Sequence, residues 1–497
     1  MVDFEELTTF MQDKGFVYGP EPSIYGGLAG FYTYGPLGKL LKNNIENAIR
    51  KVFTKYDFWE VECPTVMPRI VWEASGHLEG FTDPLIKCSN QKCNSLFRVD
   101  KFIKEIYPKE SVKKSDYLKF LKENKAKCTS CGSPLNLELK DHNLMMKTQV
   151  GVDTEVYNRP ETATTTYLPF KDYLKFFRDK LPFGVFQIGK AYRNEISPRQ
   201  FLVRMREFTQ AEGQLFILKG EKDGFSPYND VKDKKLPFLL AKTQQDGKDK
   251  ITNITIDDAI EKKYLKNKAY AWTLSVAYEL FLEMGITESK IRLRQHTEDE
   301  IAFYADDAWD LEINLSSLGW EEFCGIHDRT DYDLKRHEQY SKVKLQVQGD
   351  KEKETPHILE IAFGTDRSLL GVVDSSYEDD KKRGNKVLHF KPSIAPIQVG
   401  VFSLVNKLND QTMKVFDLVK NNFICVFDKS GSIGRRYARA DEQGVPYCVT
   451  FDFDSLEDSA VTIRDRDSTK QVRVKISELN NVLSKLVNGE VEFGKME

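Results

Sequence analysis

The segment 191–208, AYRNEISPRQFLVRMREF, places several arginines among apolar residues. If the chain is extended from residue 201 to 212, the side chains of Arg204, Phe208 and Glu212 lie on one face, because successive side chains of a strand alternate. The opposite face is mainly apolar, as a core-facing side requires. A planar guanidinium binds phosphate, and an aromatic ring stacks on a base. The pattern predicts a site for a flat polyanion that carries an aromatic base.

A hairpin would bring a second strand to the same surface. Residues 185–195 are expected to form a strand that ends with Arg193 and Glu195, and a proline fixes φ in the turn that follows. Antiparallel pairing then places both residues beside Arg204 and Phe208. The alternative interpretation is a charged face exposed to solvent, which is the commonest pattern on an antiparallel sheet.

The segment 356–370, PHILEIAFGTDRSLL, has a second chemical pattern. One face of the predicted strand is bulky and apolar, whereas the other carries the carboxylate of Glu360 and then smaller side chains such as Ala362. Small residues are needed where a ligand lies against the backbone of a strand. A helix is predicted to follow, with Asp366 and Arg367 in its first turn.

Four of the eight cysteines form two close pairs, Cys88-x4-Cys93 and Cys128-x2-Cys131. Four thiolates can bind zinc tetrahedrally, and such a site explains how a lysine-rich segment with little apolar content could fold. The alternatives are free thiols or a site whose metal has been lost. The remaining cysteines lie in apolar surroundings and are predicted to be buried thiols: Cys63, Cys324, Cys425 and Cys448.

Length and composition indicate how many domains carry these sites and which class of protein they belong to. A chain of 497 residues predicts two to four domains, and 40% hydrophobic with 30% charged residues is typical of a globular protein. The net charge of −3 neither favours nor excludes a nucleic acid, since local basic patches could hold one. No apolar run has the length of a membrane span, and the acidic N-terminal stretch does not resemble a signal peptide. A cytoplasmic location and no membrane partner are expected.

The elements that would position the sites follow from periodicity. Residues 84–147 and 217–268 have little alternation and are expected to be insertions, the first containing cysteines and the second charged and solvated. The other predicted elements are a helix over 40–56, a strand within 58–68 that ends at Pro64, a buried helix over 269–284, and strands over 291–304, 308–316, 320–327 and 356–364.

The last hundred residues differ in pattern. From 395 to 497, strand and helix signals alternate, which predicts an α/β module with a mostly parallel sheet. Arg435, Arg436 and Arg439 fall at the start and in the first turns of a helix, where they would suit phosphates. The alternative is a solvated helix face.

Taken together, these segments resemble the class II aminoacyl-tRNA synthetases. The matching segments are Arg193-x-Glu195 with Phe208 for the second motif of that class, Gly364-x-Asp366-Arg367 for the third, and the helix over 40–56 with the strand ending at Pro64 for the first. The resemblance implies an α+β fold, in which an antiparallel sheet is flanked by helices and followed by a C-terminal α/β anticodon-binding domain. The expected domains are 1–393 and 394–497.

Within that class the chain is most similar to the dimeric glycyl-tRNA synthetases of the archaeal and eukaryotic type. The similar strings are IYGGLAGFYTYGPLG (24–38), RPETA (159–163), RNEISPR (193–199), REFTQAE (206–212), RQH (294–296), GIHDRTDYDL (325–334), GSIGRRYARADEQG (431–444) and VTIRDRD (461–467). The similarity covers nearly the whole chain outside 217–268.

The resemblance implies an ATP site whose residues come from several of these strings. Arg193 would bind the α-phosphate, Arg204 the outer phosphates, and Phe208 would stack on adenine. Glu195 would orient the adenine or a magnesium-bound water, and Glu322 would contact ATP and Mg²⁺. The implied ATP-binding set is Arg193, Asn194, Glu195, Arg204, Met205, Phe208, Glu322, Phe323 and Arg367, of which Arg193, Glu195 and Arg367 would be catalytic.

The resemblance also implies a glycine site. Glu161 and Glu212 match the acids that bind the ammonium group, Arg329 matches the arginine that binds the carboxylate, and Glu360 lies where the pocket closes. Ordinary structural ion pairs are the alternative for these charged residues. The implied glycine-binding set is Glu161, Glu212, Arg329, Glu360, Ala362 and Arg98.

The chain departs from the family at one position of this site. The usual string is Glu-Pro-Ser, whereas this chain has Glu360-Ile361-Ala362. A hydroxyl expected to help hold glycine is missing, and one neutral hydrogen bond is worth about 0.5–1.5 kcal/mol, so activity should survive.

The function expected is ATP-dependent charging of tRNA(Gly) with glycine by a homodimer, with Mg²⁺ as cofactor and structural Zn²⁺. Two alternatives stay open: a non-catalytic synthetase-like protein that binds nucleic acid, and a class II enzyme for another small amino acid such as alanine or serine.

Overall fold

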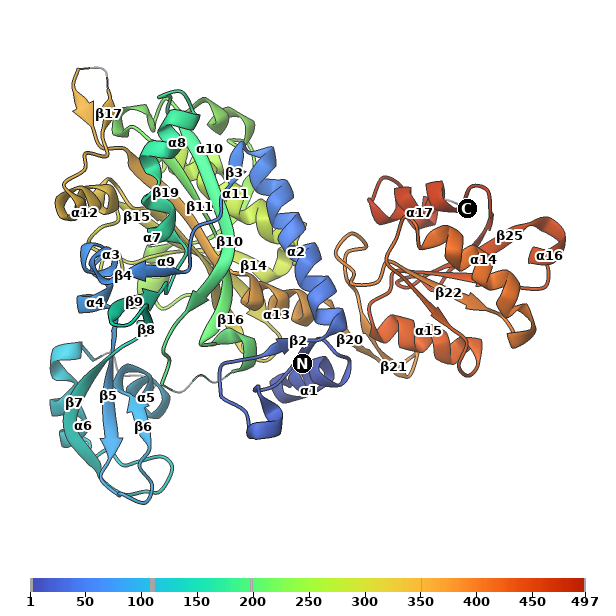
Figure 1. Ribbon diagram of the computed structural model, residues 1–497, viewed down its shortest axis with the longest axis horizontal. Coiled ribbons are helices and arrows are strands. Elements are labelled where there is room, and N and C mark those ends of the chain that lie inside the picture. Colours follow the sequence, from blue (N-terminus) through green and yellow to red (C-terminus); the bar gives the residue numbers. More distant parts are fainter. Residues whose placement is uncertain (1–2, 108–111, 197, 199, 350, 496–497) are drawn as a thin grey trace.

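The computed structural model describes residues 3–107, 112–196, 198, 200–349 and 351–495. Figure 1 shows a large body that carries most of the helices and strands, and a smaller C-terminal module beside it. The cysteine-containing segment projects from the lower left of the large body in this view, whereas the module lies at the right.

A nine-stranded sheet forms the centre of the large body. Its order is β13-β12-β14-β15-β16-β19-β11-β10-β3, and only the pairings β12·β14 and β10·β3 are parallel. The predicted α+β fold with an antiparallel sheet is therefore confirmed. The strands are β13 (Thr252–Thr255), β12 (Lys235–Leu239), β14 (Ile291–Gln295), β15 (Asp307–Leu315), β16 (Gly319–Asp328), β19 (His357–Gly364), β11 (Glu207–Ile217), β10 (Phe183–Tyr192) and β3 (Phe58–Glu60).

The hairpin β10–β11 exists, but both strands are shorter than predicted. The pairing ends at Tyr192 and Glu207, so the expected strands over 185–195 and 201–212 are wrong at this end. Gln200 and Phe201 have positive φ values of 66° and 52°, which an extended strand does not allow. The described residues between the strands include a short 3-10 helix, Phe201–Val203, instead of strand, and Ser197 and Arg199 lie outside the described residues.

Two further strand predictions need correction. The segment 58–68 contributes β3 to the large sheet and β4 (Val66–Pro68) to a separate three-stranded sheet with β8 (Met146–Val150) and β9 (Thr154–Asn158). The strand predicted over 291–304 ends at Gln295, because Glu300 accepts a hydrogen bond from the backbone N–H of Thr297 and closes a turn.

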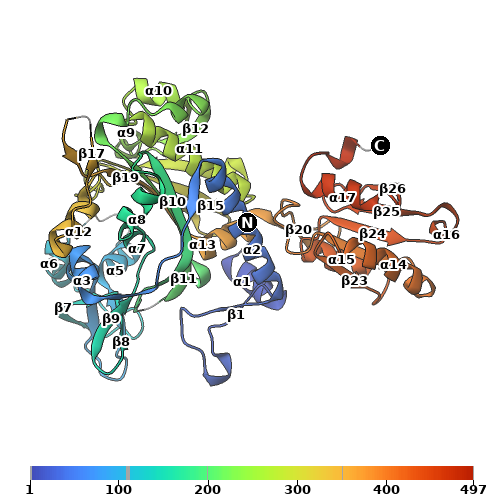
Figure 2. The same cartoon turned by 45° about the horizontal axis from the view of Figure 1, so that its top comes forward.

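Three helices cover one face of the sheet, as Figure 2 shows. They are α2 (Pro36–Lys55), α11 (Lys268–Glu283) and α13 (Thr365–Ser376), and all three lie where helices are predicted. Leu41, Ile45 and Ile49 repeat at four-residue spacing on α2 and are fully buried, because this spacing places apolar side chains on one helix face.

The segment 217–268 is not only a solvated surface. It supplies β12 and β13 to the large sheet, and α10 (Ile256–Glu261) follows. Phe225, Tyr228 and Phe238 from this segment are buried in the main core. Because lysines are frequent in this segment, its apolar residues show no clear periodicity, and the sequence did not predict these contacts.

The cysteine-containing segment has a small core of its own. It folds as a sheet of β5 (Thr82–Cys88), β6 (Leu96–Arg98) and β7 (Leu135–Asn143) with α5 (Val99–Ile106) and α6 (Tyr117–Glu123). Ile86, Phe102 and Leu121 are buried within it.

The C-terminal module contains a five-stranded sheet of order β23-β22-β24-β25-β26. Two pairings are parallel and two are antiparallel, so the predicted mostly parallel sheet is mixed instead. The elements are β22 (Val399–Ser403), α14 (Asn409–Val419), β23 (Cys425–Asp428), α15 (Ile433–Glu442), β24 (Tyr447–Phe451), β25 (Ala460–Asp465), β26 (Gln471–Lys475) and α17 (Leu479–Val487).

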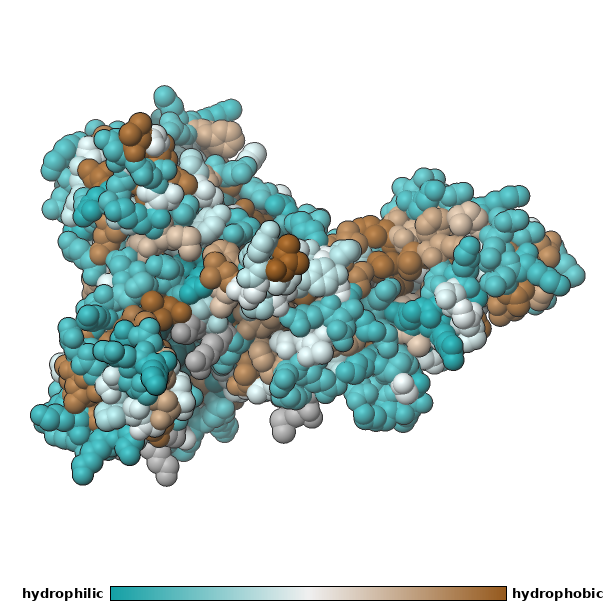
Figure 3. All heavy atoms as spheres, turned by 60° about the horizontal axis from the view of Figure 1, so that its bottom comes forward, coloured by the Kyte–Doolittle hydropathy of each residue, from teal (hydrophilic) through white to brown (hydrophobic). Residues whose placement is uncertain are grey.

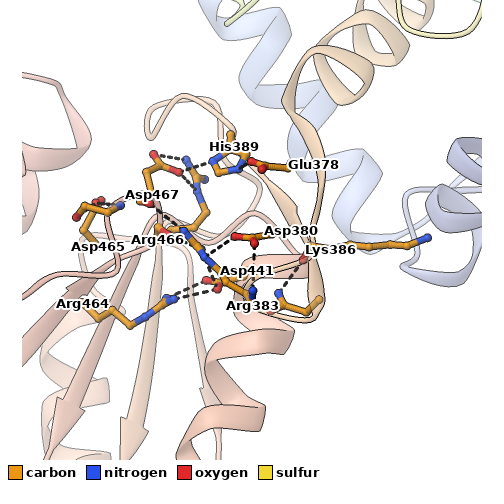
Figure 4. Close-up of polar contacts among 12 residues, drawn as sticks. Glu378, Asp380, Arg383, Lys386, His389, Asp441, Arg464, Asp465, Arg466 and Asp467 are labelled. Carbon is orange, nitrogen blue, oxygen red and sulfur yellow. Dashed lines mark hydrogen bonds and ion pairs between the residues drawn. The ribbon is translucent and has the colours of Figure 1, made fainter. Parts of the chain in front are cut away.

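Ion pairs join this module to the hairpin β20–β21 (Tyr377–Asp380 and Asn385–Leu388). Figure 4 shows that Asp441 of α15 contacts both Arg383 of the hairpin loop, at 3.4 Å, and Arg464 of β25, at 2.8 Å. His389 lies between Glu378, at 2.9 Å, and Asp467, at 2.7 Å. The two parts meet through these ion pairs and also through apolar contacts, because Ala440 and Val445 share a core cluster with Phe390.

The arginines of α15 are not all available for phosphates. Arg436 is 3% exposed and donates hydrogen bonds to the carbonyls of Ser403 and Gly431. Arg439 pairs with Asp428, so among the described residues Arg435 alone of the three is exposed and makes no ion pair. The proposed phosphate role is wrong for Arg436, because its side chain braces the loop before the helix.

Within the described part of the chain, none of the helices combines the length and apolar character needed to cross a membrane. The face in Figure 3 is mostly polar, with apolar side chains in separate areas.

Candidate active site

A cavity of about 540 Å³ opens over the strands β11, β16 and β19, next to the loop between β10 and β11. All of the predicted nucleotide and amino-acid residues except Asn194 line this one cavity. They are Arg98, Glu161, Arg193, Glu195, Arg204, Met205, Phe208, Glu212, Glu322, Phe323, Arg329, Glu360, Ala362 and Arg367.

The position of Asn194 differs from the prediction. Its backbone N–H donates to the carbonyl of Leu144 at 2.8 Å, and its own carbonyl lies 2.9 Å from the Nε2 atom of His142. Asn194 therefore connects the loop to β7 and the segment after it, and its side chain does not line the cavity. No sequence pattern signals this contact, which joins residues far apart in the chain.

The nucleotide end of the cavity contains guanidinium groups and an aromatic ring. The guanidinium of Arg193 lies 5.3 Å from the centre of the Phe208 ring and 5.4 Å from that of Phe81. The Nε atom of Arg193 donates to the carbonyl of Pro160 at 3.1 Å. These contacts fix the side chain and leave the terminal nitrogens of Arg193 available for a ligand.

Arg367 closes the same end from the first turn of α13. It donates to the backbone carbonyls of Glu322, at 2.6 Å, and Val203, at 2.9 Å. These bonds connect α13 to β16 and to the loop between β10 and β11. Glu195 is 8% exposed and lies 3.9 Å from Arg204, so each charge is partly balanced before any ligand binds.

A buried ion pair underlies this end, and the sequence did not reveal it. Lys42 of α2 is 4% exposed and bonds to Asp366, at 2.6 Å, and to the hydroxyl of Thr209, at 2.8 Å. Asp366 also accepts hydrogen bonds from Tyr34 and from the backbone N–H of Thr209. The pair thus connects α2 to the residues beside Phe208 and Arg367, three segments that are distant in sequence.

The amino-acid end is more buried and contains three carboxylates. Arg329 donates to Asp333 at 2.7 Å and to Glu360 at 3.2 Å, and its guanidinium lies 4.5 Å from the centre of the Tyr304 ring. Glu360 also accepts a hydrogen bond from the hydroxyl of Tyr167 at 2.7 Å. The arginine is held in place by partners on both sides.

The two other carboxylates come from RPETA and from β11. Glu212 accepts a hydrogen bond from the Thr162 hydroxyl at 2.5 Å. Glu161 accepts one from the Thr164 hydroxyl at 2.7 Å and lies 3.4 Å from the Nε2 atom of His77. Each carboxylate keeps further lone pairs for a bound cation.

Burial and mutual repulsion separate the pKa values of these acids. Burial, with repulsion from Glu360 and Glu161, raises the pKa of Glu212 to about 8. Burial acts in the same direction on Glu360, but Arg329 and His327 outweigh it and lower the pKa of Glu360 to about 2. The pKa of Glu161 is also lowered, because His77 and Arg329 outweigh the effect of burial. A cationic ligand beside Glu212 would therefore favour its ionised form.

Arg98 and two residues without a predicted role also line the cavity. Arg98 pairs with Asp83 at 3.0 Å and with Asp100 at 2.7 Å, which places it at the edge of the cysteine-containing segment. Tyr304 and His327 line the amino-acid end. His327 is part of the string GIHDRTDYDL, but a single histidine in a strand gives no signal of its own.

The paired cysteines meet as predicted. The Sγ atoms of Cys88 and Cys131 are 3.5 Å apart, and those of Cys93 and Cys128 are 3.7 Å apart. All four lie within 4.8 Å of one another. A tetrahedral site with Zn–S distances of about 2.3 Å needs sulfur separations of about 3.8 Å, so the cluster fits a zinc ion.

The remaining cysteines follow the prediction with one exception. Cys63, Cys324 and Cys448 are buried, whereas Cys425 is partly exposed on the edge strand β23.

Comparison with known proteins agrees with this geometry. Residues 398–486 match the family model of the anticodon binding domain. The chain is 35% identical to the glycine–tRNA ligase of Methanothrix thermoacetophila, over 99% of this chain and 98% of the relative. It is 37% identical to the glycine–tRNA ligases of Methanocaldococcus jannaschii, over 97% and 98%, and of Thermococcus gammatolerans, over 98% and 99%.

The antiparallel sheet, the arginine-lined cavity and the C-terminal module together define a class II aminoacyl-tRNA synthetase. Within that class, the extent and identity of the matches decide the family. The chain belongs to the glycine–tRNA ligase family.

Proposed function

We propose that the protein activates glycine with ATP and transfers the glycyl group to the 3′ end of tRNA(Gly). The observation that carries this proposal is a single cavity with cations and an aromatic ring at one end and buried carboxylates with one arginine at the other. ATP fits the first end and an amino acid the second. Membership of the glycine–tRNA ligase family does not favour a non-catalytic binder or an enzyme for another amino acid.

In the first step, the carboxylate of glycine attacks the α-phosphorus of ATP, which forms glycyl-adenylate and releases pyrophosphate. Arg193 binds the α-phosphate and stabilises the charge that develops there. Phe208 stacks on adenine, while Arg204 and Arg367 bind the outer phosphates and the opposite side of the nucleotide. The protein contributes positioning and electrostatics, with no nucleophile of its own.

The amino-acid end orients glycine for this attack. Glu161 and Glu212 bind the ammonium group, and Arg329 binds the carboxylate. In the second step, a hydroxyl of the terminal ribose of tRNA attacks the glycyl carbonyl and AMP leaves. No side chain beyond the Cα of glycine is needed to fill this end.

Magnesium and zinc both fit groups on the chain. Glu322 lines the nucleotide end of the cavity, and a hard cation with oxygen ligands suits such a carboxylate. Glu322 would hold the Mg²⁺ that accompanies ATP and neutralises phosphate charge. Cys88, Cys93, Cys128 and Cys131 would hold a structural Zn²⁺, which metal analysis of the purified protein would detect at one ion per chain.

The proposal also covers the domains, the cellular location and the oligomeric state of the protein. Residues 1–393 form the catalytic domain, with a zinc-binding insertion at 84–147 and a charged insertion at 217–268, and residues 394–497 bind the anticodon. The enzyme works in the cytoplasm as a homodimer. Trp59, in the edge strand β3, is 55% exposed, which supports an interface there. Light scattering would measure the mass.

Glycine-dependent exchange of pyrophosphate into ATP, followed by charging of tRNA(Gly), tests the proposed function. Both activities are expected. Exchange with alanine or serine but not glycine would contradict the amino acid assigned, and tRNA binding without any exchange would indicate the non-catalytic alternative.

A further inference from the structure

His327 occupies the floor of the amino-acid end. It lies in β16 opposite Glu360 of β19, and two residues earlier Gly325 lies opposite Ala362. Because side chains two positions apart on a strand share a face, the imidazole is on the same face as these neighbours. His327, Gly325, Glu360 and Ala362 all line the cavity.

The imidazole folds back over Gly325. A Cβ atom built on Gly325 would lie 2.6 Å from the Cε1 atom of His327, which is closer than real side chains allow. The ring therefore covers the bare backbone of Gly325, beside the small side chain of Ala362. The His296 ring lies nearly perpendicular to the His327 ring, with the two ring centres 6.2 Å apart. The histidine takes up space that small neighbours on both strands leave open.

One nitrogen of this ring has no hydrogen-bond partner in the described part of the chain. The Nδ1 atom of His327 is buried and makes no hydrogen bond with the part of the chain that the structure describes. Its nearest charged neighbour is the Oε1 atom of Glu360, at 3.6 Å, which Arg329 already contacts at 3.2 Å. A buried polar atom without a partner is costly, and a ligand in the cavity could supply the partner.

Ala362, opposite Gly325, offers no polar side-chain atom to a ligand at this point of the floor. We propose that His327 is the specificity-determining residue of the amino-acid end. Its ring fills the space that a substrate side chain larger than hydrogen would need, and its Nδ1 atom supplies a polar contact that Ala362 and Gly325 cannot make. This inference rests on the proposed function, and it assigns glycine selectivity to a residue of β16.

The size of the effect follows from the limits of steric selection. A pocket discriminates against one additional methyl or methylene group by about 10–200-fold. Removal of the imidazole opens the floor above Gly325 and Ala362 to the methyl group of alanine or the hydroxymethyl group of serine. Glycine loses one polar contact in the same variant, so both changes reduce selectivity.

The experiment measures pyrophosphate exchange with glycine, alanine and serine in the wild-type enzyme, His327→Ala and His327→Gln. The ratio of kcat/KM for glycine to that for alanine is expected to fall at least about tenfold in His327→Ala. The glutamine variant keeps a polar group of intermediate size and should stay within about threefold of wild type. His389→Ala, at the junction with the C-terminal module, is the matched control and should keep the wild-type ratio.

A ratio unchanged in His327→Ala, with exchange intact in the wild type, would overturn this inference alone. Equal loss of exchange with all three amino acids in both variants would also overturn it, since a purely structural role lowers every activity together. Absence of glycine-dependent exchange in the wild-type enzyme would overturn the proposed function, and this inference with it.

Discussion

The two ends of the cavity solve different physical problems. At the nucleotide end, Arg193 and Arg367 donate to backbone carbonyls, Arg193 also packs near two aromatic rings, and neither arginine forms an ion pair within the described part of the chain. At the amino-acid end, Arg329 is paired with Asp333 and Glu360, and Glu212 has a pKa raised to about 8. The first end awaits a polyanion, whereas the second end holds buried charges of both signs and awaits a zwitterion.

This difference explains how a small ligand can be selected. A cluster of uncompensated cations attracts any phosphate-rich molecule and depends little on its shape. A buried set of positive and negative groups accepts only a ligand that places an oppositely charged group beside each of them, because every unpaired buried charge costs free energy. Substitutions at the two ends should therefore change different kinetic constants.

The largest effect is expected from Arg193→Ala. Loss of a group that stabilises charge in the transition state typically lowers kcat by about 10²–10³-fold. Single-turnover formation of adenylate would measure this loss, with Arg473→Ala in the C-terminal module as the control. A variant with near-normal kcat and a raised KM for ATP would instead assign Arg193 to ground-state binding only.

Glu212→Gln should affect the opposite end. Loss of a charge-assisted hydrogen bond of about 1.5–3 kcal/mol raises the KM for glycine by about 10–150-fold, while the KM for ATP changes little. An equal rise in the KM values for glycine and ATP would contradict the assignment of different ligands to the two ends.

The same residue predicts a pH dependence. Since the ammonium group favours ionised Glu212, glycine affinity should rise with pH up to about 8 in the wild type, and this rise should be absent in Glu212→Gln. Stability has the opposite sign: the folded state binds the extra proton, so the contribution of Glu212 to the free energy of unfolding is lost as pH rises from the ordinary glutamate pKa of 4.5 to the raised pKa of about 8. Calorimetry across this range measures both trends.

Phe208→Ala should weaken the nucleotide end by the stacking energy of one base. Stacking is worth about 1–3 kcal/mol, so the KM for ATP should rise about 5–150-fold with the KM for glycine nearly unchanged. Phe453→Ala, an exposed phenylalanine of the C-terminal module, is the matched control. Unaltered ATP binding would remove the ring from the proposed adenine site.

The smallest effect is expected from Ala362→Ser. A restored hydroxyl can add one neutral hydrogen bond of about 0.5–1.5 kcal/mol, so the KM for glycine should fall by about tenfold at most. A rise instead would show that the ring of His327 already fills the space, which would sharpen the account of the amino-acid end.

The sequence predicted the residues that line the nucleotide end better than the buried residues that hold them in place. Arg193, Phe208 and Arg367 lie in short motifs whose neighbours are local in the chain, so type and spacing identified them. Lys42 gave no signal, because a lysine on an amphipathic helix normally faces solvent. Only the packing of α2 against β11 and α13 buries it beside Asp366.

The amino-acid end and the strand boundaries depended on contacts across the fold. His327 shares the floor with Glu360 only because β16 pairs with β19 in a particular register. The hairpin strands were predicted too long because the alternation of polar and apolar residues continues into the loop. The sequence does not reveal the positive φ of Gln200, because glutamine usually has a negative φ.

The central claim is that one cavity holds the nucleotide and the amino acid at opposite ends. A crystal structure with a non-hydrolysable analogue of glycyl-adenylate tests this claim most directly. The account predicts the adenine ring on Phe208 and the amino group within hydrogen-bond distance of Glu161 and Glu212. An analogue bound in the reverse orientation, or in another cavity, would contradict it.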